Sequence, residues 1–181
     1  MDAIPSFPLF PDPTRERVFK KTTGPCGVCK QSRGVLYDGP IYGPAPASDT
    51  QVCPWCIASG DAGKLGAVFN DASVYSSQSE PARLNPADRE IVEKRTPGFI
   101  TWQGNHWVMC CGRACVYLGE ADAKDLQGRW AEAVPSMFVG FDYPPDEIAE
   151  TVASVRREGS PAAYVFQCQV CSKFQGYWDC D

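Results

Sequence analysis

Two short cysteine pairs decide the fold of this chain, Cys26-Gly27-Val28-Cys29 and Cys53-Pro54-Trp55-Cys56. Two residues lie between the thiols of each pair, and 23 residues lie between the pairs. Such a turn directs both sulfurs at one ion, and two such turns complete a tetrahedral shell of four thiolates. We therefore predict a zinc site made of Cys26, Cys29, Cys53 and Cys56. An iron–sulfur cluster, a redox dithiol at Cys53 and Cys56, and ordinary free thiols remain the alternatives.

A second cysteine group is less regular. The run Cys110-Cys111-Gly112-Arg113-Ala114-Cys115 precedes Cys168-Gln169-Val170-Cys171 by 52 residues. Neighbouring residues of a strand point to opposite faces, so we expect only one of Cys110 and Cys111 to be a ligand. The predicted second zinc site is Cys111, Cys115, Cys168 and Cys171. Cys110 or His106 remain possible substitutes, and buried reduced thiols are the alternative to a metal site.

The composition favours metal sites over disulfides. The 181 residues include ten Cys, one His, 16 Gly and 16 Pro, and the formal net charge is −5. The chain begins with an acid and two prolines where an export signal has a basic and then an apolar region, and it lacks a long apolar stretch. We expect a cytoplasmic protein, in which thiols stay reduced.

Catalysis is not expected. His106 is the only histidine, and zinc held by four thiolates has no open position for water. Phosphate-binding glycine motifs, the Gly-x-Ser-x-Gly motif and the zinc-deaminase pattern are absent from the sequence. We therefore predict a non-enzyme whose metal is structural.

The expected architecture is α+β, with small zinc-ribbon-like knuckles, short antiparallel strands and about three helices. We predict three parts that pack into one unit: an extended N-terminal arm (1–25), a first zinc-knuckle module (26–80) and a second hairpin and knuckle module (81–181). Proline-rich spacing in the arm predicts that Phe7, Leu9 and Phe10 are buried.

Local signals place the individual elements. Asn85 and Pro86 predict a helix over 86–95, and Pro144-Pro145 opens a second helix that ends near Arg156. A third, weaker helix is expected within 57–69. Predicted strands are 99–103 and 106–110, joined as a hairpin through Gly104-Asn105, and 163–167 and 173–178 around the last cysteine pair.

Several motifs resemble the bacterial CbrC family, which is associated with colicin tolerance. They run in order along nearly the whole chain: Phe10-Pro11-Asp12-Pro13, Cys26-Gly27-Val28-Cys29, Tyr37 to Tyr42, Cys53 to Gly60, Phe69-Asn70-Asp71, Thr96 to Phe99 with Trp102-Gln103, Cys111 to Cys115 and Trp178 to Asp181. Arg113 and Cys110 depart from that family's pattern. The resemblance implies a cytoplasmic protein that protects a bacterium from a protein toxin.

Charge suggests the kind of partner. Residues 120–150 hold eight acidic and two basic residues, and two zinc–thiolate shells lower the net charge of −5 to about −9. We expect a basic protein partner, such as a toxin domain, rather than nucleic acid or membrane. The candidate contact residues are Glu120, Asp122, Asp125, Asp142, Asp146, Glu147 and Glu150. A nucleic-acid-binding zinc ribbon and a redox or metal-responsive protein are the alternative functions.

Overall fold

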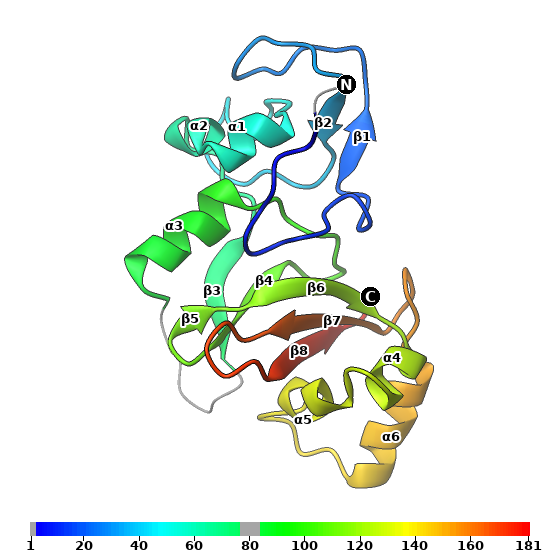
Figure 1. The fold of residues 1–181 in the computed structure, drawn as a ribbon. Coiled ribbons are helices and arrows are strands. Elements are labelled where there is room, and N and C mark those ends of the chain that lie inside the picture. The colour runs from blue at the N-terminus through cyan, green and yellow to red at the C-terminus, as the bar shows by residue number, and fades with distance from the viewer. Residues whose placement is uncertain (1–2, 77–83) are drawn as a thin grey trace.

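The computed structural model describes residues 3–76 and 84–181, which form a two-stranded sheet at the top of Figure 1 and two three-stranded sheets below it. The more C-terminal of these two, called the lower sheet, has helices beneath it. In chain order the elements are β1 (Phe19–Lys21), β2 (Val35–Tyr37), α1 (Pro54–Ala58), α2 (Asp61–Lys64), β3 (Asp71–Ser76), α3 (Pro86–Arg95), β4 (His106–Cys110), β5 (Arg113–Ala114), β6 (Val116–Ala121), α4 (Ala123–Gln127), the 3-10 helix η1 (Ala131–Ala133), α5 (Val134–Met137), α6 (Pro145–Ser154), β7 (Ala162–Gln167) and β8 (Phe174–Asp179).

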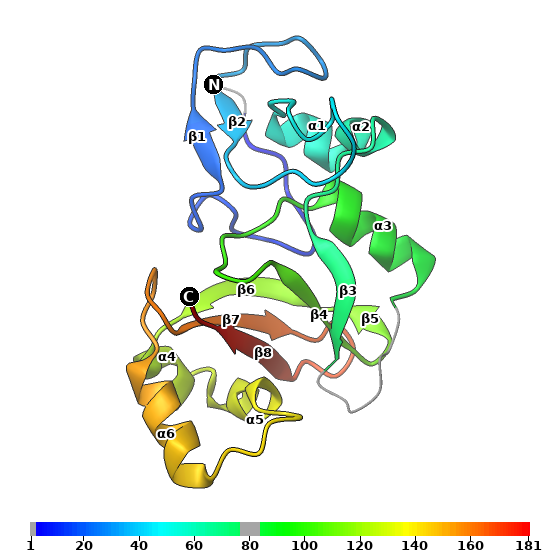
Figure 2. The ribbon, with the colours of Figure 1, turned by 180° about the vertical axis from the view of Figure 1, so that it is seen from behind.

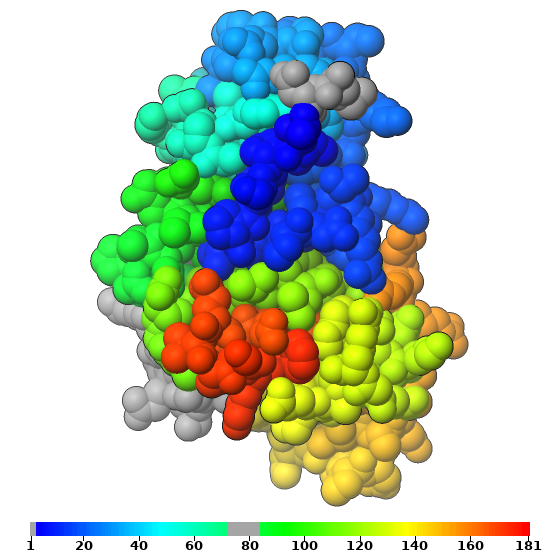
Figure 3. Space-filling view, viewed as in Figure 1, coloured from blue at the N-terminus to red at the C-terminus, as the bar shows by residue number. Residues whose placement is uncertain are grey.

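The N-terminal arm ties the upper part of the molecule to the lower part. Phe7, Leu9 and Phe10 are buried, as their spacing predicts. The backbone amide of Tyr117 in β6 donates to the Leu9 carbonyl at 2.8 Å. Figure 3 shows this segment, in dark blue, lying across the face of the molecule. The arm then continues into β1, which pairs antiparallel with β2.

The predicted hairpin over 99–110 is wrong. Strand β4 begins at His106 as expected, but it pairs parallel with β3 and antiparallel with the two-residue β5. Residues 99–105 form a loop instead, and the reason is a long-range contact. The amides of Trp102 and Gln103 each donate to the Asp179 carboxylate at 3.1 Å, which uses the hydrogen bonds that a strand partner would need.

The sheet of β6, β7 and β8 separates two cores. All its pairings are antiparallel, so the predicted strands around the last cysteine pair are confirmed. Alternate residues of β7 face opposite sides: Tyr164 and Phe166 enter the large core, while Ala163 and Val165 enter the small one. Helices α4, α5 and α6 cover the small core beneath the sheet (Figure 2).

Two helices occur where local signals place them. In α3 the Asn85 side chain accepts a hydrogen bond from the Asp88 amide, and Pro86 occupies the first turn. Helix α6 begins after Pro144 but ends at Ser154, before the arginines. The weak helix expected within 57–69 is instead two short helices, α1 and α2, which meet at Gly60 with a φ of +80°.

The α+β class with short antiparallel strands is confirmed, although the described residues contain six α-helices rather than about three. The additional ones have four or five residues each, too short to show a hydrophobic period. The predicted module boundary between residues 80 and 81 lies outside the described residues. In the described ranges, each helix is too short or too polar to cross a bilayer.

Candidate metal centres

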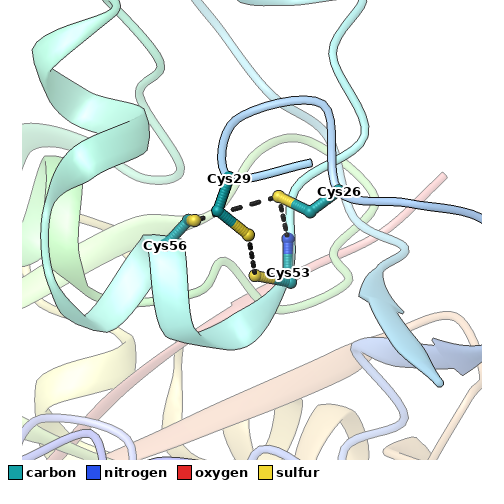
Figure 4. A group of neighbouring side chains, drawn as sticks. All are labelled: Cys26, Cys29, Cys53 and Cys56. Carbon is teal, nitrogen blue, oxygen red and sulfur yellow. Dashed lines mark hydrogen bonds between the residues drawn. The ribbon is translucent and has the colours of Figure 1, made fainter. Parts of the chain in front are cut away.

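The first cysteine group closes between a loop and the start of a helix. Cys26 and Cys29 lie in the loop before β2, while Cys53 and Cys56 lie at the N-terminal end of α1 (Figure 4). Their four sulfurs all lie within 4.8 Å of one another. The Cys26–Cys56 and Cys29–Cys53 sulfur pairs are each separated by 3.8 Å.

These separations fit a tetrahedral metal shell. Four sulfurs bound at about 2.3 Å to a central ion stand about 3.8 Å apart along the edges of the tetrahedron. A disulfide would require about 2.05 Å. All ten cysteines lie in the described part of the chain, and all are free thiols. The first group therefore fits a metal site.

The second group gathers at one end of the lower sheet. Cys110 is the last residue of β4 and Cys111 begins the turn after it, while Cys168 and Cys171 come from the turn between β7 and β8. Cys110 lies 3.8 Å from both Cys111 and Cys171, sulfur to sulfur. All four sulfurs again lie within 4.8 Å of one another, so the described residues contain two four-cysteine groups that fit two metal sites.

One cysteine pair of each centre lies in a loop with the same backbone hydrogen bonds: Cys26 and Cys29 in the first centre, and Cys168 and Cys171 in the second. In the first, the Cys26 amide donates to the Gln31 carbonyl and the Lys30 amide to the Cys26 carbonyl. In the second, the Cys168 amide donates to the Lys173 carbonyl and the Ser172 amide to the Cys168 carbonyl.

The two loops also share a left-handed residue and an amide aimed at sulfur. Lys30 and Ser172 have φ values of +62° and +61°. The Val28 and Val170 amides point at the sulfurs of Cys26 and Cys168, at 3.4 and 3.3 Å. Both loops are therefore knuckles of one type, whose amides offset thiolate charge.

Cys115 is a correction to the predicted second ligand set. The structure brings together the other seven predicted ligands, and Cys110 takes the place given to Cys115. Cys111 is left-handed, with a φ of +52°, so the chain turns there and the alternation of a strand no longer separates Cys110 from Cys111. Cys115 instead pairs its amide with Val108 and lies fully buried in the large core.

Backbone amides lower the pKa of one thiol in each centre. Burial alone raises the pKa of Cys26, but backbone amides outweigh burial and lower it to about 7. The same balance lowers the pKa of Cys168 to about 7. Burial and the neighbouring thiols raise the pKa of Cys53 to about 11 and also raise that of Cys110. The negative charge of one thiolate disfavours ionisation of the thiols beside it, and a bound divalent cation offsets this repulsion.

The two centres differ in exposure. In the first, Cys26, Cys53 and Cys56 are buried and Cys29 is half-buried. In the second, Cys111 and Cys171 are exposed and only Cys168 is buried. An external thiol or chelator can therefore approach the second centre directly, while the first is enclosed by the large core.

Asp88 supports the second centre and was not predicted from sequence. Its buried carboxylate accepts two hydrogen bonds from the Arg113 guanidinium, at 2.7 and 3.0 Å, and one from the Ala114 amide at 3.0 Å. It thus fixes β5, which follows the Cys110-Cys111 turn, to the start of α3. The Arg113 hydrogen bonds hold the pKa of Asp88 below its usual range. Acidic residues are common in the first turn of a helix because they complement the helix dipole, so the sequence gives no separate sign that Asp88 binds Arg113 and Ala114.

We expect Asp88→Asn to lower the free energy of unfolding by about 1–3 kcal/mol, because Arg113 and Ala114 lose a charged acceptor. The folded pKa of Asp88 is lowered, so its contribution is present above a pH of about 4 and is lost as the pH falls further. Urea unfolding at pH 7 and pH 3 measures both effects. Glu90→Gln, on the same helix and exposed, is the control. Equal unfolding of the two variants at pH 7 would contradict this role.

The predicted partner-binding acids fall into two groups. Three of them have partners within the fold. Glu120 accepts a hydrogen bond from the Glu158 amide, and Asp122 caps α4. Asp125 forms ion pairs with Arg129 and Arg157. The other four are exposed and form no ion pair within the described residues; they are Asp142, Asp146, Glu147 and Glu150.

His106 and Cys180 lie outside both groups. The His106 ring is half-buried, with Nδ1 at 3.9 Å from the Asp71 carboxylate, and it packs against Tyr177. Cys180 is half-buried near the C-terminus, where its backbone carbonyl accepts a hydrogen bond from the side-chain Nε2 of Gln103. Neither residue replaces a cysteine of the second centre.

Comparison with known proteins assigns the family and corrects the resemblance to CbrC. The chain matches UPF0167, described as an uncharacterised protein family, over residues 4–180. It is 32% identical to the UPF0167 protein Mb2317 of Mycobacterium bovis over 179 residues, which cover 97% of this chain and 93% of that one. It is 30% identical to the UPF0167 protein PA1536 of Pseudomonas aeruginosa over 179 residues, 98% and 97% of the two chains.

No solved structure matches the chain. The matching family and relatives carry the UPF0167 name, so the CbrC assignment is wrong and the colicin tolerance that it implied has no support. The match extends over nearly the whole chain, from the N-terminal arm through both cysteine groups. This chain belongs to the UPF0167 family.

Proposed function

We propose that the chain is a zinc-binding protein that holds two Zn²⁺ ions, one in each four-cysteine group, and that neither ion is catalytic. The observation that carries this proposal is the sulfur geometry, since both groups have 3.8 Å separations and all four sulfurs of each lie within 4.8 Å. Zinc suits a tetrahedral shell of four thiolates, and such a shell leaves no position for water or substrate.

The proposal includes a reducing compartment, the cytoplasm, because eight of the ten thiols must remain free to bind metal. Its support is that all ten cysteines are free thiols in the fold. The positive charge of Zn²⁺ would also offset the repulsion between the thiolates of each group.

Metal analysis and chelation test the proposal together. Purified protein should contain two zinc equivalents per chain, and a colorimetric chelator should remove them in two phases of one equivalent each. The second centre should supply the fast phase because Cys111 and Cys171 are exposed. One equivalent or none, or iron in place of zinc, would refute the proposal, and a single phase would refute the assigned difference between the centres.

A second, separate proposal concerns a protein partner. The four exposed acids lie on α6 and the loop before it, and Phe141 in that loop is 48% exposed. An apolar side chain beside unpaired acids favours a basic protein surface, which opposite charge would attract and orient.

Charge reversal on α6 tests the proposed contact with a basic protein. Wild-type protein immobilised at the C-terminus should retain basic proteins from a lysate of the source cells at low salt, and Glu147→Lys with Glu150→Lys should lose them. Glu90→Lys on α3 is the control for a change of charge elsewhere. Retention of the same proteins by the α6 variant would show that this surface is not the contact.

A further inference from the structure

A cavity of about 590 Å³ lies apart from both metal centres. Five separate segments line it: residues 15–17 of the N-terminal arm, 100–102 of the loop before β4, Glu120 of β6, Tyr164 of β7, and 157–158 of the loop before β7. That last loop projects beside the C-terminus in Figure 1. The volume lies within the range of pockets that bind small molecules, about 300–1,000 Å³.

Two carboxylates of this cavity are partly buried. Glu16 accepts hydrogen bonds at Oε2 from the Tyr117 hydroxyl, at 3.3 Å, and from the Glu120 amide, at 3.2 Å. Glu120 accepts the Glu158 amide at Oε1, at 2.7 Å. Burial raises the pKa of both side chains, and for Glu120 the nearby Glu16 charge adds to this effect.

The backbone makes room for Glu16. β6 has an irregularity between Tyr117 and Gly119, where Gly119 adopts a φ of +122°. A Cβ at Gly119 would lie 2.6 Å from Oε1 of Glu16, so only glycine permits the carboxylate to rest there. Within the described residues, neither Oε1 of Glu16 nor Oε2 of Glu120 accepts a hydrogen bond, so each keeps an oxygen for another donor.

An exposed aromatic face forms one wall. Trp102 is 52% exposed, yet its Nε1 donates to the Gly159 carbonyl at 2.6 Å and its amide is held by Asp179. The indole is therefore fixed in place before anything binds. Ile100 beside it is 66% exposed. Large apolar side chains that are exposed and already ordered lose little entropy when they are covered.

The rim is strained and carries positive charge. Arg17 and Glu158 both have left-handed backbones, with φ values of +54° and +56°, and an ion pair of 2.8 Å joins them. Such strain concentrates at functional sites. Arg15, also on the rim, is exposed and its guanidinium forms no ion pair with the residues that the structure describes.

We propose that this cavity binds a small zwitterion with an apolar side chain, the chemistry shared by free amino acids and short peptides. The ammonium group meets the free oxygens of Glu16 and Glu120, the carboxylate meets Arg15, and the apolar side chain covers Trp102 and Ile100. A polyanion would face two carboxylates, and a purely apolar ligand would leave one oxygen of each carboxylate without a donor.

Calorimetry on the zinc-loaded full chain tests the ligand class. The panel contains L-leucine, L-phenylalanine and the dipeptide Leu-Leu, with isopentylamine lacking the carboxylate and 4-methylpentanoate lacking the amine. We expect binding by the amino acids, the dipeptide or both, which distinguishes the two sources, and binding at least about tenfold weaker by the two analogues. No binding by the zwitterions at millimolar concentration, or equal binding by either analogue, would overturn the proposal.

Variants test the assigned contacts. Glu120→Gln and Trp102→Ala should each weaken binding about tenfold or more, while zinc content and the melting temperature show that the fold is intact. Glu90→Gln on α3 and Leu65→Ala after α2 are the matched controls, because both residues are exposed and neither lines the cavity. Unchanged binding in both Glu120→Gln and Trp102→Ala would overturn the proposed site.

Discussion

Cys53→Ser is expected to remove the zinc ion of the first centre and to destabilise the fold severely. Cys53 is fully buried, begins α1 and lies 3.8 Å from Cys29, so its loss breaks the connection between the helix and the loop before β2. Structural zinc shells contribute about 10–16 kcal/mol, as much as the whole stability of a typical domain, about 5–15 kcal/mol. We expect an unfolded chain or a melting temperature lower by more than about 10 °C.

Metal content and circular dichroism measure the two parts of this result. Cys180→Ser is the matched control, because Cys180 lies outside both centres and should leave two zinc ions in place. Two zinc equivalents in Cys53→Ser, with an unchanged melting temperature, would exclude the first centre as a metal site. A loss of both ions would agree with the large core failing to form, since that core includes residues of both centres.

The second large effect separates Cys111 from Cys115. Cys111→Ser should remove the fast-exchanging zinc ion, because Cys111 is a member of the exposed shell. Cys115→Ala should keep both ions and lower stability only by about 1–2 kcal/mol, the cost of a small cavity in the core. That loss corresponds to a melting temperature lower by about 2–8 °C.

Zinc analysis of the two variants gives a direct answer, with their chelation kinetics as a second measurement. Zinc loss in Cys115→Ala with retention in Cys111→Ser would reverse the assignment and restore the ligand set that spacing predicts. Loss in both variants would mean that Cys115 acts on the centre through the Cys168 thiol beside it.

Elements defined by local signals were predictable. The start and end of α3 follow from Asn85, Pro86 and the residues around Thr96, all within one or two turns of the helix. The strands on either side of the Cys168–Cys171 knuckle, β7 and β8, are likewise marked by their own composition. The first cysteine group follows from its two Cys-x-x-Cys pairs, the spacing typical of a shell of four thiolates.

Features defined by distant residues were not predictable. Residues 99–103 have strand composition, but the Asp179 carboxylate near the other end of the chain captures their amides. The Cys110 assignment depends on a left-handed backbone at Cys111, which counting residues does not reveal. The cavity is built by five segments that are separated in sequence, and only the fold brings them together.

The loops that each centre closes imply an order of events during synthesis. The sulfur contacts of the first centre join residues 24 and 30 positions apart, whereas Cys110 and Cys171 are 61 positions apart. Short closures cost less entropy and need only the first third of the chain to have emerged. The second centre must wait for β7 and β8, the last strands to be made. Until then Cys110 and Cys111 lack their two partners from the turn between β7 and β8, and a reducing compartment such as the one proposed above is what keeps them free thiols.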